Sequence, residues 1–283
     1  MDISKRVVVV TGGGSGIGEA LCRSFHKAGA AHVVVADMAG DEAARVAGDI
    51  GGTAVTIDVS DEAAIIDMVN ATEAAHGPIG VFVSNAGFVT IGGVEDTNER
   101  IQKMWEVHVL AHVYAARAVL PQMIANGGGY LLNTASAAGL LTQIGSMSYS
   151  VTKGAAVSLA EWLAITHQHQ GIGVSVLCPQ AVDTNIVANS PDLGSGVDAD
   201  GVDDMEGGVA SGDGVVTSED VATQCLAAIA EERFWVLPHP EVGEYAIRKA
   251  TDVDRWLSGM RRFQGALFPD GPLPGDAIAS WQT

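Results

Sequence analysis

Tyr149 and Lys153 are the residues whose types and spacing first indicate chemistry. They lie four positions apart at the start of an apolar segment that predicts a helix over residues 149–167, so their side chains share one face. A lysine ammonium beside a phenol favours the phenolate, which lowers the pKa of the phenol from its ordinary value of about 10. A phenol tuned in this way can pass a proton to or from a substrate oxygen. Ser136, just past an apolar run over residues 130–134, could hydrogen-bond the same oxygen.

A Tyr-x-x-x-Lys pair alone is more often part of a surface helix, and a glycine-rich turn near the N-terminus gives this pair its context. The apolar run Val7–Val10 predicts a buried strand, and the turn after it reads Thr11-Gly12-x-x-x-Gly16-x-Gly18. A glycine turn between a strand and a helix points backbone N–H groups and the helix N-terminus at a phosphate. A flexible loop is the alternative, and we favour a dinucleotide site because the next predicted strand ends in an acid.

This second apolar strand, over residues 32–36, ends in Asp37. The acid lies 19 residues beyond Gly18, near the ~20 expected for a carboxylate that binds the adenosine ribose. Its carboxylate would accept hydrogen bonds from the ribose 2′-OH and repel a 2′-phosphate. No basic residue stands in Met38-Ala39-Gly40 or in Gly14-Ser15. Asp37 therefore favours NAD over NADP, and an exposed acid at a strand end is the alternative.

Apolar strands alternate with helical segments along most of the chain. Strands are predicted over residues 7–10, 32–36, 53–57, 79–83, 130–134, 171–177 and 233–237, and helices over 41–50, 61–76, 97–125 with a break near 107–111, 149–167, 218–231 and 242–263. This alternation predicts an α/β fold: a single-domain, Rossmann-like, doubly wound parallel sheet with helices on both faces. Ligands bind at the carboxyl ends of such strands, where Thr11, Asp37, Asp58 and Asn85 fall.

Composition narrows the classes of partner. The chain has 283 residues, 47% of them apolar, and a formal net charge of −19, which disfavours a nucleic acid or an anionic membrane as partner. No run approaches the ~18–20 apolar residues of a membrane span, and no signal peptide is visible at the N-terminus, so we expect a cytoplasmic protein. Its three cysteines, Cys22, Cys178 and Cys225, lie in apolar contexts and are expected to be small core residues.

We expect residues 1–240 to form the NAD-binding catalytic domain and residues 241–283 a C-terminal helical extension and tail. Residues 185–216 are rich in Gly and Asp and contain no aromatic residue, so they can bury little apolar area. This segment is either a mobile substrate flap or a disordered acidic insertion, and the sequence leaves both open.

Taken together, the motifs resemble those of the short-chain dehydrogenase/reductase family over roughly residues 7–184. The turn Gly12-x-x-Ser15-Gly16-Ile17-Gly18 resembles the cofactor turn of the family, and Ser136, 13 residues before Tyr149, resembles its catalytic serine. The other cofactor residues implied by the resemblance are Asp37 and Met38, the adenine-contacting pair Asp58 and Val59, the segment Asn85, Ala86 and Gly87 that supports the central strand, Lys153 and Tyr149 themselves, and Pro179, Val182 and Thr184 near the nicotinamide.

The resemblance also implies roles for the catalytic residues. Tyr149 would be the general acid/base, Ser136 would position and polarise the carbonyl, and Lys153 would bind the nicotinamide ribose while tuning Tyr149. A hydride would then pass directly between the substrate carbon and the nicotinamide. The implied activity is that of an NAD-dependent alcohol dehydrogenase or ketone reductase, and the implied assembly, through the helices around 108–125 and 149–167, is a homotetramer.

Two positions depart from the family pattern. His108 stands where the family has an asparagine whose backbone carbonyl holds a water in a proton relay. It either substitutes quietly through its own carbonyl, titrates in the relay, or is a packed structural histidine, and these remain open. His108 and His112 have a spacing that can hold zinc, but the glutamate of H-E-x-x-H is missing, so we expect no metal. Gln180 replaces the glycine that usually follows Pro179.

The substrate is expected to be a small-molecule secondary alcohol or ketone of modest size. Its pocket would draw on Ala138, Leu140, Gln143, Met147, Gln180 and the segment from Ile186 onward. Two other functions remain as alternatives: a dinucleotide-binding regulator that has lost catalysis, and an epimerase or dehydratase of the extended relatives. The intact Ser136, Tyr149 and Lys153 argue against the first, and the glycine spacing, which is not Gly-x-x-Gly-x-x-Gly, argues against the second.

Overall fold

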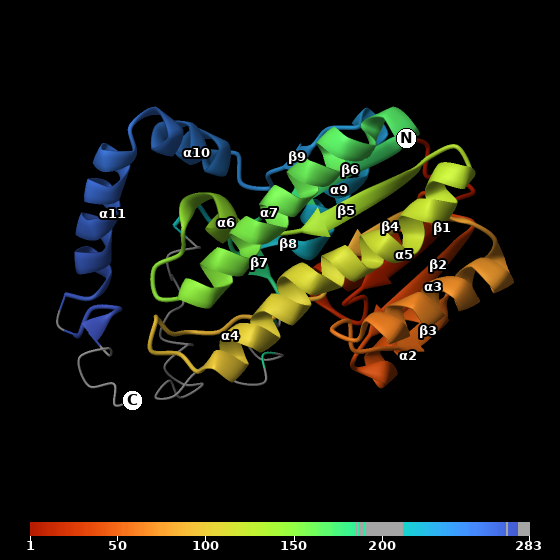
Figure 1. Ribbon diagram of the computed structural model, residues 1–283, viewed down its shortest axis with the longest axis horizontal. Helices are drawn as coiled ribbons and strands as arrows, with labels where there is room; N and C mark the ends of the chain where they lie inside the picture. Colours follow the sequence, from red (N-terminus) through yellow and green to blue (C-terminus); the bar gives the residue numbers. More distant parts are fainter. Residues whose placement is uncertain (185, 187–189, 191–211, 270, 277–283) are drawn as a thin grey trace.

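A computed structural model describes residues 1–184, 186, 190, 212–269 and 271–276, and its centre is a sheet of seven parallel strands (Figure 1). The strand order is β3-β2-β1-β4-β5-β6-β9. The strands are β1 (Val7–Thr11), β2 (His32–Asp37), β3 (Thr53–Thr56), β4 (Ile79–Ser84), β5 (Gly129–Thr134), β6 (Ile172–Leu177) and β9 (Trp235–Val236). A separate parallel pair joins β7 (Val182–Asp183) to β8 (Val216–Thr217).

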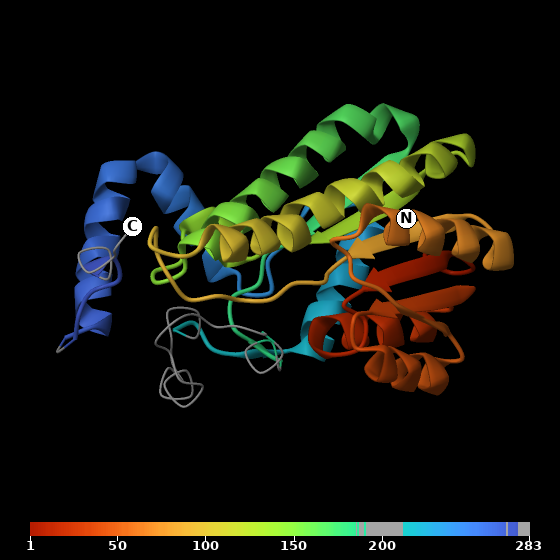
Figure 2. The same ribbon diagram turned by 60° about the horizontal axis from the view of Figure 1, so that its bottom comes forward.

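Helices cover both faces of the sheet, with a hydrophobic core on each side (Figure 2). One face carries α1 (Gly16–Lys27), α2 (Gly40–Ile50) and α9 (Ser218–Glu231), and the other carries α3 (Glu62–His76), α5 (Ala111–Ala125) and α7 (Met147–His167). Alternate side chains of β1 enter opposite cores, Val8 and Val10 on the first side and Val7 and Val9 on the second. Because both faces are buried, β1 is apolar throughout, and each buried valine contributes about 1.5 kcal/mol or more to stability. The predicted Rossmann-like, doubly wound fold is confirmed.

The long helical segment after β4 is interrupted where the sequence predicts a break. Helix α4 (Asn98–Trp105) runs into a π-helical turn, η1 (Glu106–Leu110), which continues as α5. A π-turn widens the helix and rotates the side chains after it, and such turns are frequent at functional sites. This one places His108, which is fully buried, on the side facing α7.

Several of the described elements differ from the sequence prediction, including the short strands β7 and β8, which were not predicted. The short helix α6 (Ala137–Leu141) was not predicted, because five residues show no periodicity. The predicted last helix over 242–263 is wrong: it is two helices, α10 (Glu241–Thr251) and α11 (Val253–Leu267). Asp252 between them is extended, and its side chain accepts a hydrogen bond from the Arg255 backbone, so it begins a new helix. A turn of 3₁₀ helix, η2 (Gln168–Gln170), ends α7.

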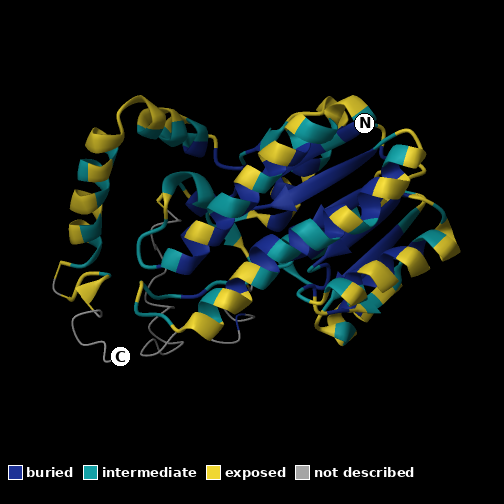
Figure 3. Cartoon of the chain, in the orientation of Figure 1, coloured by how far each residue is buried: buried dark blue, intermediate teal, exposed yellow. Residues whose placement is uncertain are grey.

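The C-terminal helices leave the body of the protein. In Figures 1 and 3, α10 leads away from the sheet and α11 stands apart from it, and α11 contains no buried residue. Most of the predicted flap over 185–216 lies outside the described residues, and Val216 at its end belongs to β8. None of the described helices is long and apolar enough to cross a membrane. The three cysteines are free and buried in the cores, as predicted.

Candidate active site

A cavity of about 630 Å³ opens at the carboxyl edge of the sheet. It brings together most of the residues singled out from the sequence: Gly12, Ser15, Gly16, Ile17, Asp37, Met38, Asp58, Val59, Asn85, Ala86, Gly87, Ser136, Ala138, Gln143, Tyr149, Lys153, Pro179, Gln180, Val182, Thr184 and Ile186. Four others, Gly18, His108, Leu140 and Met147, are not part of its lining. A single cavity therefore runs from the glycine turn past Asp37 and Asp58 to the Tyr149–Lys153 pair.

The glycine turn can approach a ligand closely only because it lacks side chains. Gly12 and Gly16 have φ values of +65° and +50°, in the left-handed region that glycine adopts without strain. A Cβ atom at Gly18 would lie 1.9 Å from the Gly12 carbonyl oxygen, so this glycine serves the turn itself and not the cavity wall. Helix α1 begins at Gly16, which directs its N-terminus to the cavity. The turn thus fits a pyrophosphate.

Asn85 ties together three of the strands that end at the cavity. Its side-chain amide donates to the Thr11 carbonyl over 3.1 Å, and its side-chain oxygen accepts from the Thr134 hydroxyl over 3.1 Å. The Asn85 backbone N–H donates to the Thr11 hydroxyl over 2.9 Å. β1, β4 and β5 are therefore held in register at the edge where the cavity opens.

Ser136, Tyr149 and Lys153 come from two helices that touch. Ser136 is the N-cap of α6, where its hydroxyl accepts a hydrogen bond from the Ala138 backbone. Tyr149 and Lys153 lie one turn apart near the start of α7. The helices approach so closely at Gly139 that a Cβ atom there would lie 2.6 Å from the Lys153 carbonyl oxygen. This contact holds the serine next to the phenol.

The Lys153 ammonium is buried close to the phenol. Its Nζ donates to the Thr134 carbonyl over 3.1 Å and lies 5.6 Å from the centre of the Tyr149 ring. Only 3% of Lys153 is exposed, and this burial lowers the pKa of its ammonium to about 8. The ammonium is still mostly protonated at neutral pH, so it places a positive charge at the inner end of the cavity.

Burial raises the pKa of Tyr149, and a hydrogen bond with the Ser136 side chain lowers it in part. The predicted lowering of the phenol pKa is therefore wrong for the structure, because desolvation of the phenolate dominates. The phenol is protonated at neutral pH in this state. The phenol can donate a proton to a substrate oxygen. To accept a proton it must first be a phenolate, which a bound ligand and the neighbouring Lys153 ammonium would stabilise.

His108 has a hydrogen-bond partner on both ring nitrogens. Nε2 accepts from the Phe88 backbone N–H over 3.2 Å, and Nδ1 lies 3.1 Å from the Thr152 hydroxyl. Because Phe88 can only donate, Nε2 carries no proton and Nδ1 is the donor. Burial, followed by the charge of Lys153, lowers the pKa of His108 well below its ordinary value. The ring geometry supports a neutral His108 over a titrating one, and it is compatible with both a packed histidine and one that substitutes through its backbone carbonyl. Neither ring nitrogen is available to a metal.

Replacing His108 with asparagine is expected to leave the shape of the pH–rate profile unchanged. The imidazole is neutral throughout the working pH range, so removing it takes away no titrating group. The smaller side chain leaves Phe88 or Thr152 without its partner, and the melting temperature should fall by several degrees. Loss of one limb of the pH profile in His108→Asn would contradict the neutral assignment.

Several lining residues were not identified from the sequence. They are Ile57, Phe88, Val89, Thr90, Arg100, Lys103, Val107, Thr134, Ala135, Ala137, Leu141, Thr142 and Ala181. Phe88, Val89 and Thr90 extend the segment after Gly87 along the cavity and give it an apolar wall. Arg100 and Lys103 lie three residues apart on α4, and only the fold brings that helix to the cavity. The Lys103 ammonium lies 3.1 Å from Asp58 Oδ2.

The chain has relatives among named dehydrogenases. A 1-deoxy-11-beta-hydroxypentalenate dehydrogenase from Streptomyces exfoliatus is 34% identical over 267 residues, covering 91% of this chain and 92% of that enzyme. A meso-2,3-butanediol dehydrogenase from Serratia marcescens is 35% identical over 195 residues, 68% of this chain and 77% of that enzyme. A crystal structure of a short chain dehydrogenase/reductase from Burkholderia phymatum in complex with NAD superposes with a TM-score of 0.80 at 28% identity, covering 90% of this chain and 96% of that one.

The family model described as short chain dehydrogenase matches residues 6–193, which include the glycine turn, the Ser136–Tyr149–Lys153 cluster and the strands that carry them. This match and the solved structure agree with the architecture. The chain belongs to the short-chain dehydrogenase/reductase family of oxidoreductases.

Proposed function

We propose that this protein is an NAD-dependent oxidoreductase that transfers a hydride between the nicotinamide and a secondary alcohol or its ketone. One observation carries the proposal. Ser136, Tyr149 and the buried Lys153 ammonium line the same cavity as the glycine turn and Asp37. A proton donor and a nucleotide cradle in one cavity are what hydride transfer to or from a carbonyl carbon requires.

The proposed mechanism assigns one task to each side chain. The bound dinucleotide supplies or accepts the hydride. In ketone reduction, the Tyr149 hydroxyl donates its proton to the substrate oxygen as negative charge develops there, and the Ser136 hydroxyl donates a hydrogen bond to the same oxygen. The Lys153 ammonium, 5.6 Å from the ring centre, stabilises the phenolate left behind. In alcohol oxidation the same groups act in reverse.

We propose a substrate of modest size with an apolar body. Phe88, Val89 and Leu141 line the cavity on the side of Ser136, and Gln143 and Gln180 offer amide groups that can orient a second polar atom. The butanediol dehydrogenase and the hydroxypentalenate dehydrogenase among the relatives are named for secondary alcohols, which supports this class.

The preference for NAD is tested by titrating the purified protein with NADH and NADPH while following nicotinamide fluorescence. We expect NADH to bind at least about tenfold more tightly, because the Asp37 carboxylate accepts from a ribose hydroxyl and repels a phosphate. The Asp37→Asn variant keeps the shape and loses the charge, so its preference should shrink. Tighter binding of NADPH by the wild-type protein would overturn this role of Asp37, and binding of neither nucleotide would defeat the proposed function.

We also propose a homotetramer in which α5 and α7 form a subunit interface. On α7, Trp162 and Ile165 are 56% and 81% exposed, a large apolar area for a free helix face. A cytoplasmic location is supported by three cysteines that remain unpaired. We retain residues 1–240 as the catalytic domain, with α10 and α11 as an extension.

A further inference from the structure

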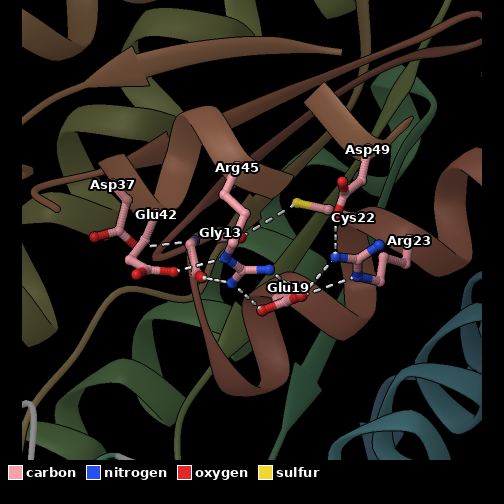
Figure 4. A network of polar contacts seen from close by, with 9 residues as sticks. Gly13, Glu19, Cys22, Arg23, Asp37, Glu42, Arg45 and Asp49 are labelled. Carbon is pink, nitrogen blue, oxygen red and sulfur yellow. Dashed lines mark hydrogen bonds and ion pairs between the residues drawn. The ribbon is translucent and has the colours of Figure 1, made fainter. Parts of the chain in front are cut away.

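The Arg45 side chain, from α2, reaches the glycine turn. Its Nη2 donates to the Gly14 carbonyl over 3.1 Å. Figure 4 shows the Arg45 guanidinium paired with Glu19 and Glu42. The sequence shows no basic residue in the turn or directly after Asp37, yet the fold brings the Arg45 guanidinium there from a position on α2 that lies eight residues after Asp37. Arg45 does not line the cavity, so any effect on a coenzyme must act through the residues that it holds.

Carboxylates occupy most of the Arg45 guanidinium. Glu19 on α1 accepts from Nη1 over 3.0 Å and from Nη2 over 2.7 Å, and Glu42 on α2 accepts from Nε over 2.8 Å. The hydrogen bond from Arg45 is also the main reason that the pKa of Glu19 lies below its ordinary value, so this acid is charged at neutral pH. A bidentate pair fixes the orientation of the guanidinium as well as its position.

Gly14 connects Arg45 to Asp37. The Gly14 carbonyl accepts from Arg45, and the Gly14 N–H donates to Asp37 Oδ2 over 2.9 Å. The other oxygen of Asp37 accepts from the Ala39 backbone over 2.9 Å. A Cβ atom at Gly14 would lie 3.0 Å from Asp37 Oδ2, so a side chain at this position would press on the carboxylate. Arg45 and Asp37 thus hold the same residue through its two backbone polar groups.

The net charge of the ion pairs around Arg45 also affects which coenzyme can bind. Glu19, Asp37, Glu42 and Asp49 carry four negative charges against the two positive charges of Arg23 and Arg45, which leaves a formal charge of −2. A free guanidinium beside Asp37 would attract the 2′-phosphate of NADP. Here the guanidinium is paired with carboxylates on two sides, and the remaining charge repels a phosphate.

We propose that Arg45 is a positioning and specificity residue for the coenzyme. Through Gly14 it holds the Asp37 carboxylate toward the ribose, and its pairing with Glu19 and Glu42 withholds it from a 2′-phosphate. This inference rests on the proposed NAD-dependent function.

The first test compares Arg45→Met with Arg23→Met as a matched control. Arg23 also binds Glu19, over 2.8 Å, but its second partner is Asp49, and its hydrogen bonds within the described part of the chain do not include the turn. Arg45→Met should weaken NADH binding about tenfold in the fluorescence titration, and Arg23→Met should change it less than about twofold. Arg45→Lys keeps the positive charge but loses the bidentate geometry of the guanidinium, so its NADH affinity should lie between those of Arg45→Met and the wild type. Thermal unfolding of each variant checks that the fold is intact.

The second test frees the guanidinium. In a Glu19→Gln/Glu42→Gln double variant Arg45 keeps its charge and loses both charged partners. NADPH affinity should rise about tenfold while NADH affinity stays within about threefold. Unchanged NADPH affinity in the double variant, or equal NADH affinity in Arg45→Met, Arg23→Met and wild type, would overturn the inference. Those results leave the proposed function standing, whereas a wild-type protein that binds neither nucleotide would defeat the proposed function itself.

Discussion

The Tyr149→Phe variant is expected to turn over about 10³-fold more slowly than the wild type and to bind NADH with an affinity within about threefold. The substitution removes one hydroxyl from a buried ring, whose packing against Met104 and Ala138 remains. General acid/base catalysis contributes roughly 10²–10⁴-fold, and in the proposed mechanism no other group can supply the proton. Turnover of a secondary alcohol with NAD, followed by absorbance of NADH, measures the first effect, and fluorescence titration measures the second.

Tyr130→Phe is the matched control for that experiment. Tyr130 is also buried, and its hydroxyl bonds to Ser175 over 2.7 Å on β6, but it does not line the cavity. Its loss should cost about 1 kcal/mol of stability and leave turnover unchanged. If Tyr149→Phe keeps more than about a tenth of the wild-type activity, Tyr149 is not the proton donor.

The fold could be predicted from features that are local in the sequence. Val7–Val10 is apolar on both faces because a hydrophobic core covers β1 on each side of the sheet, and polar residues such as Asp37 and Asn85 stand at strand ends because the cavity opens there. The sequence also predicts a break near 107–111, where the structure has the π-helical turn η1. Family resemblance added the relation of Ser136 to Tyr149, which no local pattern supplies.

The features that the sequence did not predict depend on contacts between distant segments. Arg45 reaches Gly14 only because α2 packs beside α1, and Lys103 reaches Asp58 only because the fold brings α4 beside the segment after β3. The pKa of Tyr149 depends on burial, which a spacing of four residues does not reveal. Asp252 separates α10 from α11 because its carboxylate caps the N-terminus of α11. The residues on both sides of it have a helical pattern, so the sequence pattern alone predicts one continuous helix.

Lys153→Met is expected to abolish nearly all activity and yet to make the protein more stable at pH 7. The ammonium is buried, and its pKa falls from 10.5 to about 8 on folding. A shift of that size corresponds to about 3 kcal/mol of destabilisation at any pH where both states are protonated. Methionine has a similar length and no charge to desolvate, although the Thr134 carbonyl loses its partner. We expect a net gain of about 1–2 kcal/mol, with turnover reduced about 10³-fold.

The pH dependence of this gain is its sharpest check. Below pH 8 both the folded and the unfolded wild type keep the proton on Lys153, so the full cost of burial is present. Between about pH 8 and 10.5 the folded state releases the proton and the unfolded state retains it, so the wild type gains stability as pH rises. The advantage of Lys153→Met should therefore be largest near pH 7 and shrink toward pH 10.

Lys249→Met is the control, because Lys249 also bonds to a backbone carbonyl, that of Leu140, but is only half-buried and lies outside the cavity. Burial also lowers the pKa of Lys249, but this lysine is less buried than Lys153, so the gain in Lys249→Met should be clearly smaller. A Lys153→Met protein that is less stable than wild type at pH 7 would contradict the prediction, because it would mean that the buried ammonium stabilises the fold.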